Sequence, residues 1–296
     1  MNGRSYHKYF GDEKNYMPTD DREQDRMDIH HQLILRILNE ELHKAPVENP
    51  RSVLDVGTGT GAWAIDMADK WPRAKVTGID LSPIQPKWVP PNCIFEVDDV
   101  EREWTDNNDA FDFIHFRNVA QGITEWDYVL SEAYRCLEPG GFVELSETGA
   151  MAYCDDGTMS ATNATKYYCD LIARAMTLVN RPPITSGVLP ARLRAAGFVD
   201  IHSFELKQPF GVWAKEERLK LAGRCLLEQA ETLFHSYGMA AFTRILGMDD
   251  EEADQICREG CEAASDPNTH IYSIHYISYG RKPRPGENVE NWDDGR

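Results

Sequence analysis

The nine residues Val53–Gly61 constrain the fold of this 296-residue chain more than any other stretch. They read Val-Leu-Asp-Val-Gly-Thr-Gly-Thr-Gly. The apolar run 52–56 predicts a short buried strand of a parallel sheet. The glycines that follow predict a tight turn, because glycine tolerates positive φ and lets a ligand approach the backbone. Apolar residues at helical spacing from Ala64 to Trp71 then predict a helix, which Pro72 ends. Strand, glycine turn and helix together are typical of a nucleotide-binding site.

An acidic residue at the end of the next predicted strand strengthens this interpretation. Asp80 closes the strand 75–80, about 20 residues beyond the glycines, where such folds bind the ribose hydroxyls of an adenosine. The spacing Gly-x-Gly-x-Gly differs from the dinucleotide fingerprint, whose third glycine comes one residue later. No Lys-Ser or Lys-Thr pair follows the loop, which argues against a P-loop for nucleoside triphosphates.

Strands and helices alternate along the first half of the chain. We expect strands at residues 52–56, 75–80, 93–97, 111–116 and 142–147. This alternation predicts an α/β fold with a parallel, doubly wound sheet. Ligands of such sheets bind outside the carboxyl ends of the strands. Four residues that could contact a ligand lie at these ends, namely Gly57, Asp80, Asp99 and Arg117.

The second half of the chain predicts more helix than strand. We expect two further strands, at 199–206 and 271–278, which bring the sheet to seven strands. The predicted helices are 162–179, 189–196, 216–237, 240–246 and 249–264. The expected organisation is an N-terminal tail and lid helix (1–48), a sheet domain (49–283) with a helical cap at about 214–268 inserted before the last strand, and a flexible tail (284–296).

Five segments, in order, resemble the motifs of class I S-adenosylmethionine (SAM) methyltransferases. They are Asp55–Gly61, Ile79–Asp80, Phe95–Val100, Phe111–Asn118 and Leu137–Glu144. The resemblance covers roughly residues 50–150. It implies a Rossmann-like methyltransferase fold, an enzymatic function and SAM as the cofactor.

The resemblance also implies roles for individual residues. Gly57 and Gly59 would admit the methionyl part of SAM, and Asp80 would bind the ribose. Asp99 with Val100 would meet the adenine, and Arg117 would bind a carboxylate. The full implied set of SAM contacts is Tyr16, Arg26, Asp55, Gly57, Thr58, Gly59, Asp80, Leu81, Asp99, Val100, Arg117 and Asn118.

A narrower resemblance covers most of the chain. The segments Tyr16–Arg26, Phe116–Asn118 and Tyr279–Pro283 are similar to fungal LaeA-like methyltransferases. That family contains natural-product methyltransferases and regulators of secondary metabolism. The resemblance implies transfer of a methyl group to a hydroxyl or carboxylate oxygen of a small natural product. Two alternatives stay open: a regulator that acts through protein partners, and a methyltransferase fold with a non-methylating role.

Methyl transfer from SAM depends mainly on positioning, because the sulfonium is already activated. A phenol or alcohol acceptor would profit from a general base, whereas a carboxylate would not. Glu147, at the end of the fifth predicted strand, is our candidate for that base, with His30 and His115 as the other possibilities. We expect apolar and aromatic side chains after residue 148, Tyr237 among them, to wall the acceptor half of the site.

Composition limits the possible partners. The net charge is −18, from 31 basic and 49 acidic residues, which disfavours nucleic acids and anionic membranes as partners. Seven scattered cysteines and no recognisable signal peptide predict reduced thiols in the cytoplasm, with the nucleus as the alternative. No apolar run is long enough for a membrane span, and no spacing predicts a metal site.

Overall fold

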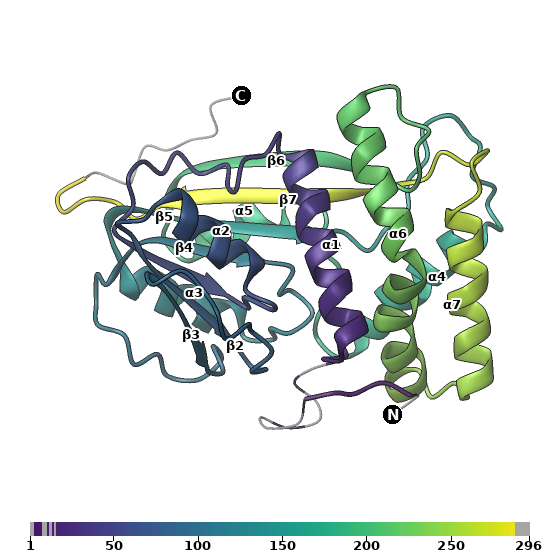
Figure 1. Ribbon diagram of the computed structural model, residues 1–296, viewed down its shortest axis with the longest axis horizontal. Helices are drawn as coiled ribbons and strands as arrows, with labels where there is room; N and C mark the ends of the chain where they lie inside the picture. The colour runs from purple at the N-terminus through teal and green to yellow at the C-terminus, as the bar shows by residue number, and fades with distance from the viewer. Residues whose placement is uncertain (1–2, 8–10, 12–13, 15, 288–296) are drawn as a thin grey trace.

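A seven-stranded sheet runs through the computed structural model, which describes residues 3–7, 11, 14 and 16–287 (Figure 1). The strand order is β3-β2-β1-β4-β5-β7-β6. Strands β1 to β5 pair in parallel, and β7 pairs antiparallel with β5 and β6. The predicted α/β fold with a seven-stranded sheet is therefore confirmed, and the sheet is parallel except for the pairings of β7. The strands are β1 (Ser52–Val56), β2 (Lys75–Asp80), β3 (Cys93–Val97), β4 (Phe111–Arg117), β5 (Leu137–Thr148), β6 (Val199–Pro209) and β7 (Tyr272–Arg281).

Helices cover the sheet and also form a separate layer at one end of it. Figure 1 shows α1, α6, α4 and α7 standing side by side at that end. The helices are α1 (Asp21–Ile37), α2 (Ala62–Lys70), α3 (Trp126–Cys136), α4 (Ala164–Leu178), α5 (Val188–Ala195), α6 (Glu217–Ala240), the π-helical η1 (Ala241–Ile245) and α7 (Asp250–Ala264). None of the helices in the described part of the chain is long and apolar enough to cross a membrane.

Helix α1 belongs to two hydrophobic cores at once. Leu33, Ile34 and Ile37 pack into the core of the cap, together with side chains of α4, α6 and α7. Leu35 instead joins the core that α2 forms with one face of the sheet. The opposite face of the sheet packs against α3 and α5. The cap therefore includes α1 and α4 in addition to the segment 214–268 that the sequence suggested.

Most predicted boundaries agree with the structure within a few residues, but the fifth strand begins earlier than expected. Leu137 already pairs with Phe111, and an irregularity in the register follows before Phe113 pairs with Phe142. Gly140, which has φ of +91°, lies within that irregular segment. Of the expected tail 284–296, residues 288–296 lie outside the described residues. In its described part the Glu287 carboxylate accepts hydrogen bonds from Arg281.

A buried carboxylate fixes the segment that leads into the sheet. Glu144 of β5 is 1% exposed, and its Oε2 accepts the backbone N–H groups of Lys44 and Ala45 at 2.8 and 2.6 Å. Burial raises the pKa of Glu144 to about 7, although the two N–H donors act in the opposite direction. The folded protein therefore holds a proton on Glu144 more tightly than the unfolded chain does.

The linkage between this proton and folding gives a prediction for Glu144→Gln. A raised carboxyl pKa stabilises the folded state below the unfolded pKa of 4.5, and this contribution is lost as the pH rises through about 7. Glutamine keeps an acceptor oxygen but does not titrate. The unfolding free energy of the wild type minus that of Glu144→Gln should therefore fall by up to about 3 kcal/mol between pH 4.5 and 8. Urea denaturation at several pH values measures this difference, and a difference independent of pH would contradict the assignment.

Candidate active site

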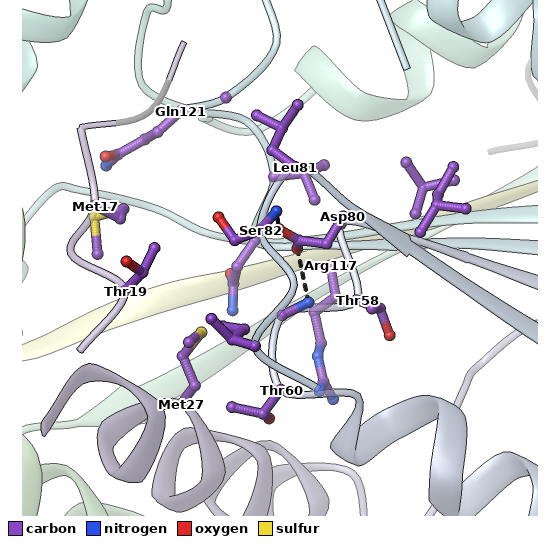
Figure 2. Close-up of a pocket in the computed structure, with 18 of the residues that line it drawn as sticks. Met17, Thr19, Met27, Thr58, Thr60, Asp80, Leu81, Ser82, Arg117 and Gln121 are labelled. Carbon is purple, nitrogen blue, oxygen red and sulfur yellow. Dashed lines mark hydrogen bonds between the residues drawn. The ribbon is translucent and has the colours of Figure 1, made fainter. Parts of the chain in front are cut away.

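A cavity of about 220 Å³ lies at the carboxyl ends of β1, β2, β3 and β4. The loops after these strands form its floor, and Lys14, residues from the segment 16–31 and Tyr237 of α6 line it from the other side. Figure 2 shows Met17, Thr19 and Met27 lying opposite Asp80, Leu81 and Ser82. The strand order reverses between β1 and β4, which is where sheets of this kind bind ligands.

The glycine loop presents its backbone to this cavity. Gly57 and Gly59 have φ of +69° and +58°, a conformation that favours glycine. A Cβ on Gly57 would lie 2.2 Å from a methyl carbon of Val119, so no larger residue fits there. The N–H groups of Gly57 and Thr58 donate to the carbonyl of Ile79 at 2.8 and 2.9 Å, which ties the loop to the end of β2.

Asp55 holds this loop in place. Its Oδ2 accepts from the Thr58 hydroxyl at 2.6 Å, and its Oδ1 lies 2.9 Å from Nδ1 of His115. The His115 ring is stacked on Trp63, with 3.8 Å between the ring centroids. Burial lowers the pKa of His115 despite the hydrogen bond to Asp55, so the ring is neutral and its Nδ1–H donates. His115 is thus buried between Trp63 and Asp55, where its hydrogen bond supports the glycine loop.

The carboxylate of Asp80 lies in the cavity, and each of its oxygens accepts one hydrogen bond from the protein backbone. Its Oδ2 accepts the Gly59 N–H at 2.8 Å, which Figure 2 marks, and its Oδ1 accepts the Ser82 N–H at 2.9 Å. Each carboxylate oxygen can accept a second hydrogen bond. Burial raises the pKa of Asp80, and the two backbone donors oppose that change. The geometry therefore leaves room for a diol, such as the two ribose hydroxyls, to bond this carboxylate.

The end of the cavity near β3 is closed by an ion pair that the sequence did not predict. Nζ of Lys14 lies 3.1 Å from Asp99 Oδ2 and 2.6 Å from Glu101 Oε2. Burial would raise the pKa of Glu101, but the Lys14 ammonium and the N–H groups of Thr124 and Glu125 bring it to about 2. The N-terminal segment is therefore held to the expected adenine end by charge.

Two adjacent residues at the end of β4 bind two adjacent histidines of α1. Nη2 of Arg117 donates to Nδ1 of His31 at 3.0 Å, and Nε2 of His31 lies 2.9 Å from Asp66. Because arginine can only donate, Nδ1 of His31 accepts, and the proton of the ring is on Nε2. Burial lowers the pKa of His31, in keeping with a neutral ring. Within the described residues, no carboxylate forms an ion pair with Arg117.

The same reasoning fixes the tautomer of His30. The backbone N–H of Thr148 donates to Asn118 Oδ1 at 3.0 Å, so the amide nitrogen of Asn118 faces Nε2 of His30, also at 3.0 Å. Nε2 of His30 therefore accepts, and the proton is on Nδ1. That Nδ1 is buried and has no hydrogen-bond partner among the residues that the structure describes. Burial, followed by the charge of Arg26, lowers the pKa of His30 well below its ordinary value.

The charges of the lining fit SAM, which carries a sulfonium, an ammonium and a carboxylate. Carboxylates predominate toward β2 and β3, where Asp80, Asp98 and Asp99 lie. The buried guanidinium of Arg117 lies at the other end, without a carboxylate partner in the described structure. An uncompensated cation in such a place favours an anionic group of a ligand, and the methionyl carboxylate is the group expected there. SAM would thus lie along the strand ends from β3 to β4.

The residues implied by the motifs come together in this cavity. Its lining includes all of Tyr16, Arg26, Asp55, Gly57, Thr58, Gly59, Asp80, Leu81, Asp99, Val100, Arg117 and Asn118. Glu147, the candidate base, is not part of the described lining. Its Oε1 accepts the N–H groups of Val119 and Ala120 at 2.9 and 3.1 Å, and burial raises its pKa to about 7. A structural contribution of Glu147 is thus visible, while its role as a base stays a prediction.

Sequence reasoning missed part of the site. Lining residues that it did not assign to the cofactor include Lys14, Met27, His31, Ser82 and Gln121. The expected wall from residues after 148 is smaller than predicted, because only Tyr237 of that region is in the described lining. The other large side chains there, such as Phe234 and Phe242, fill the core of the cap. The helical spacing of α1 alone could have shown that its residues 23, 26, 27, 30 and 31 share one face.

Comparison with known proteins agrees with this geometry. Residues 27–203 match a family described as a methyltransferase domain. Methyltransferase pytC of Aspergillus terreus is 35% identical over 95% of this chain and 87% of its own length. Secondary metabolism regulator LAE1 of Cochliobolus heterostrophus is 38% identical over 96% of this chain and 94% of its own length. A protein-methionine methyltransferase, laeA of Emericella nidulans, is 32% identical over 95% of this chain and 76% of its own length.

A solved structure shares the fold. Phosphoethanolamine N-methyltransferase 2 of Haemonchus contortus, in complex with SAM, superposes with a TM-score of 0.51 at 18% identity. The match covers 93% of this chain and 55% of that protein. At this level of identity the likeness concerns the fold.

The first prediction for the site concerns Asp80. Asp80→Ala removes an acceptor that we expect to bond both ribose hydroxyls, and hydrogen bonds to a charged group contribute about 1.5–3 kcal/mol each. The dissociation constant for SAM should therefore rise at least about tenfold. Calorimetry measures this, with the exposed Asp69→Ala on α2 as the control of equal charge change. Unchanged affinity in a folded Asp80→Ala protein would disprove the assignment.

The second prediction for the site concerns the ion pairs of Lys14. Lys14→Ala removes the ammonium that holds the N-terminal segment to Asp99 and Glu101, so affinity for SAM should fall several-fold, by about 1 kcal/mol. The loss should shrink in high salt, because salt screens the same pairs in the wild type. Titrations with SAM at low and high ionic strength test this. Lys215→Ala, a lysine whose side chain is exposed and outside the lining, is the matched control. An equal loss of affinity at both ionic strengths would exclude an electrostatic role for Lys14 in holding the N-terminal segment.

Proposed function

Because this chain belongs to the SAM-dependent methyltransferases of the LaeA and pytC type, we propose that it methylates an oxygen atom of a small molecule. The single observation that supports a small acceptor is the enclosure of the strand ends. The N-terminal segment and α1 cover them, and Tyr237 of α6 completes the lining. An acceptor group must therefore enter a cavity to reach the end of β4, which suits a small molecule better than the flat surface of a folded protein.

We assign the acceptor to one end of this cavity. Residues at the ends of β3 and β2 account for the adenine and ribose of SAM, and the loop after β1 with Arg117 of β4 accounts for the methionyl part. The acceptor then lies beyond β1, at the end lined by Arg26, His30, Asn118, Val119 and Tyr237, which we call the acceptor end. Arg26 is paired there with Glu23 at 2.8 Å, and its guanidinium lies over the Tyr237 ring, 5.6 Å from the centroid.

SAM, when bound, supplies a methyl group on a positively charged sulfur. The protein contributes position and exclusion of water. The glycine loop and Asp80 orient the nucleoside, and Arg117 holds the carboxylate. Helix α1 shields the reacting atoms from solvent. Such positioning is enough to accelerate a displacement by several orders of magnitude, since the reacting atoms are held in contact. Glu147 would contribute by holding the Val119–Ala120 backbone in place beside the acceptor.

A second function is favoured by the names of the relatives. One of the relatives reported above is called a secondary metabolism regulator, and another a protein-methionine methyltransferase. A regulator of this kind would methylate a protein or act through a protein partner. Methyl transfer from labelled SAM separates the two functions. Label in small acids, phenols or alcohols of a metabolite panel supports our proposal, and label only in protein supports the regulator.

Tyr237 provides a variant that acts on the acceptor alone. Tyr237→Ala removes a ring from the acceptor end, and losing contact with a buried aromatic ring costs about 1.5–3 kcal/mol. The KM for the acceptor should rise about tenfold or more, while the affinity for SAM stays within about twofold. Tyr167→Ala on α4 is the control, because that ring is 54% exposed and outside the described lining. Equal losses of SAM and acceptor binding would place Tyr237 in the cofactor half instead.

A further inference from the structure

The acceptor end offers hydrogen-bond donors but no described side chain that is free to take a proton. The neutral ring of His30 carries its proton on Nδ1, and its Nε2 already accepts from Asn118. Both nitrogens of the neighbouring His31 are bonded, to Arg117 and Asp66. Neither histidine can therefore act as a general base without breaking a hydrogen bond at the end of β4 or on α2.

The acidic groups nearby are engaged as well. Glu23 bonds Arg26 through Oε1 and the Ser236 hydroxyl through Oε2. Asp55 uses one oxygen for His115 and the other for Thr58. The phenol of Tyr237 has its pKa raised by burial, so it stays protonated at neutral pH. A phenol or alcohol acceptor would have no described group at this end to receive its proton.

We propose that the acceptor is a carboxylate, which His30 binds through its Nδ1–H, and that the product is a methyl ester. This inference rests on the proposed function and narrows its substrate class. A lone pair of one carboxylate oxygen forms the new bond to the methyl carbon. The carbon–sulfur bond breaks, and its electron pair stays on sulfur, which becomes the neutral thioether of S-adenosylhomocysteine. No proton is transferred, so the absence of a free base does not hinder the reaction.

The unpaired N–H donor of His30 is the observation that favours a carboxylate oxygen over a thioether sulfur as the methyl acceptor. His30 is 9% exposed, and a buried N–H without an acceptor is unfavourable until a ligand supplies one. A thioether also loses no proton on methylation, but sulfur is a weak acceptor and would leave Nδ1 unpaired. A carboxylate forms a strong, charge-assisted hydrogen bond with the same donor. Met27, three residues earlier on the same face of α1, is the flexible side chain that we expect to yield when the ligand enters.

The charges along the cavity agree with an anionic acceptor. The carboxylates of Asp80, Asp98 and Asp99 lie toward the nucleoside end, whereas the guanidinium groups of Arg26 and Arg117 lie toward β4. The negative charge of Glu23 offsets Arg26, and the methionyl carboxylate of bound SAM would offset Arg117, so neither sign of charge predominates there. An anion is therefore not repelled from the acceptor end, despite the acidic surface of the whole protein.

Nuclear magnetic resonance of the full-length protein tests the role of His30 without knowing the natural acceptor. In protein with ¹⁵N-labelled histidine and bound S-adenosylhomocysteine, Nδ1 of His30 should be protonated and Nε2 unprotonated at neutral pH. The resonance is assigned from the spectrum of His30→Gln. Asn118→Asp, which places an acceptor opposite Nε2, should move a proton onto Nε2. An unprotonated Nδ1 in the wild type overturns the proposal.

A titration then tests the acceptor class. Benzoate added to the same complex should shift the Nδ1 resonance of His30, and benzyl alcohol should need at least about tenfold more to do so, because it lacks the charge. Equal responses to the two probes, or none, would overturn the proposal. Binding of S-adenosylhomocysteine should stay within about threefold in His30→Gln, since we place His30 at the acceptor and glutamine can keep the hydrogen bond to Asn118.

Turnover separates failure of this inference from failure of the proposed function. In a panel of matched aromatic acids, phenols and alcohols, only acids should be methylated, and the rate should vary little between about pH 6 and 9. His30→Phe should lower kcat/KM for an acid about tenfold to a hundredfold, and His30→Gln, which keeps an N–H donor, should recover much of it. Methylation of phenols with a rate that rises with pH would overturn the inference and leave small-molecule O-methylation intact. Methyl groups found only in protein would overturn both the inference and the proposed function. If no compound of the panel reacts, the titration with benzoate and benzyl alcohol decides whether the inference stands.

Discussion

The hydrogen bonds between α1 and the end of β4 are the interaction on which the site depends. Two consecutive histidines on the helix meet two consecutive residues at the end of the strand: His30 bonds Asn118, and His31 bonds Arg117. These groups are enclosed between the cap core and the sheet, where an unpaired polar group costs about 1–3 kcal/mol. A shift of α1 by a single residue would break both bonds, so they fix the register of the helix. The cap is thereby positioned over the strand ends, and the cavity obtains its second wall.

Several buried acidic residues in this protein serve structure, and their hydrogen bonds explain why. Glu144 and Glu147 each accept two backbone N–H groups, and Asp55 holds a loop hydroxyl and a histidine. A carboxylate occupied in this way fixes chain segments that have no strand or helix partners of their own. It is also less available for proton transfer, because its acceptor positions are used. The position of Glu147 near the carboxyl end of β5 suggested catalysis, but only its hydrogen bonds reveal which segment it holds in place.

The sequence predicted the sheet half of the site well, since the information there is local. Gly57 and Asp80 follow directly from strand ends, and parallel strands place such ends at one edge of the sheet. The cap half was less predictable. The tautomer of His30 depends on Asn118, 88 residues away, and on the N–H of Thr148, a further 30 residues along. Lys14 reaches carboxylates beyond residue 98. No periodicity or motif specifies such pairings, because they arise only when α1 packs against both cores.

The neutrality of the two histidines matters for a cationic cofactor. A protonated imidazole beside a sulfonium would repel it, and in a site removed from water that repulsion is screened only weakly. Burial and the nearby guanidinium groups both disfavour the imidazolium forms of His30 and His31. Arg117 itself is tolerated because the methionyl carboxylate can balance it. The same α1 residues that anchor the cap therefore also keep the electrostatic environment suited to SAM, so the helix cannot be regarded as a lid alone.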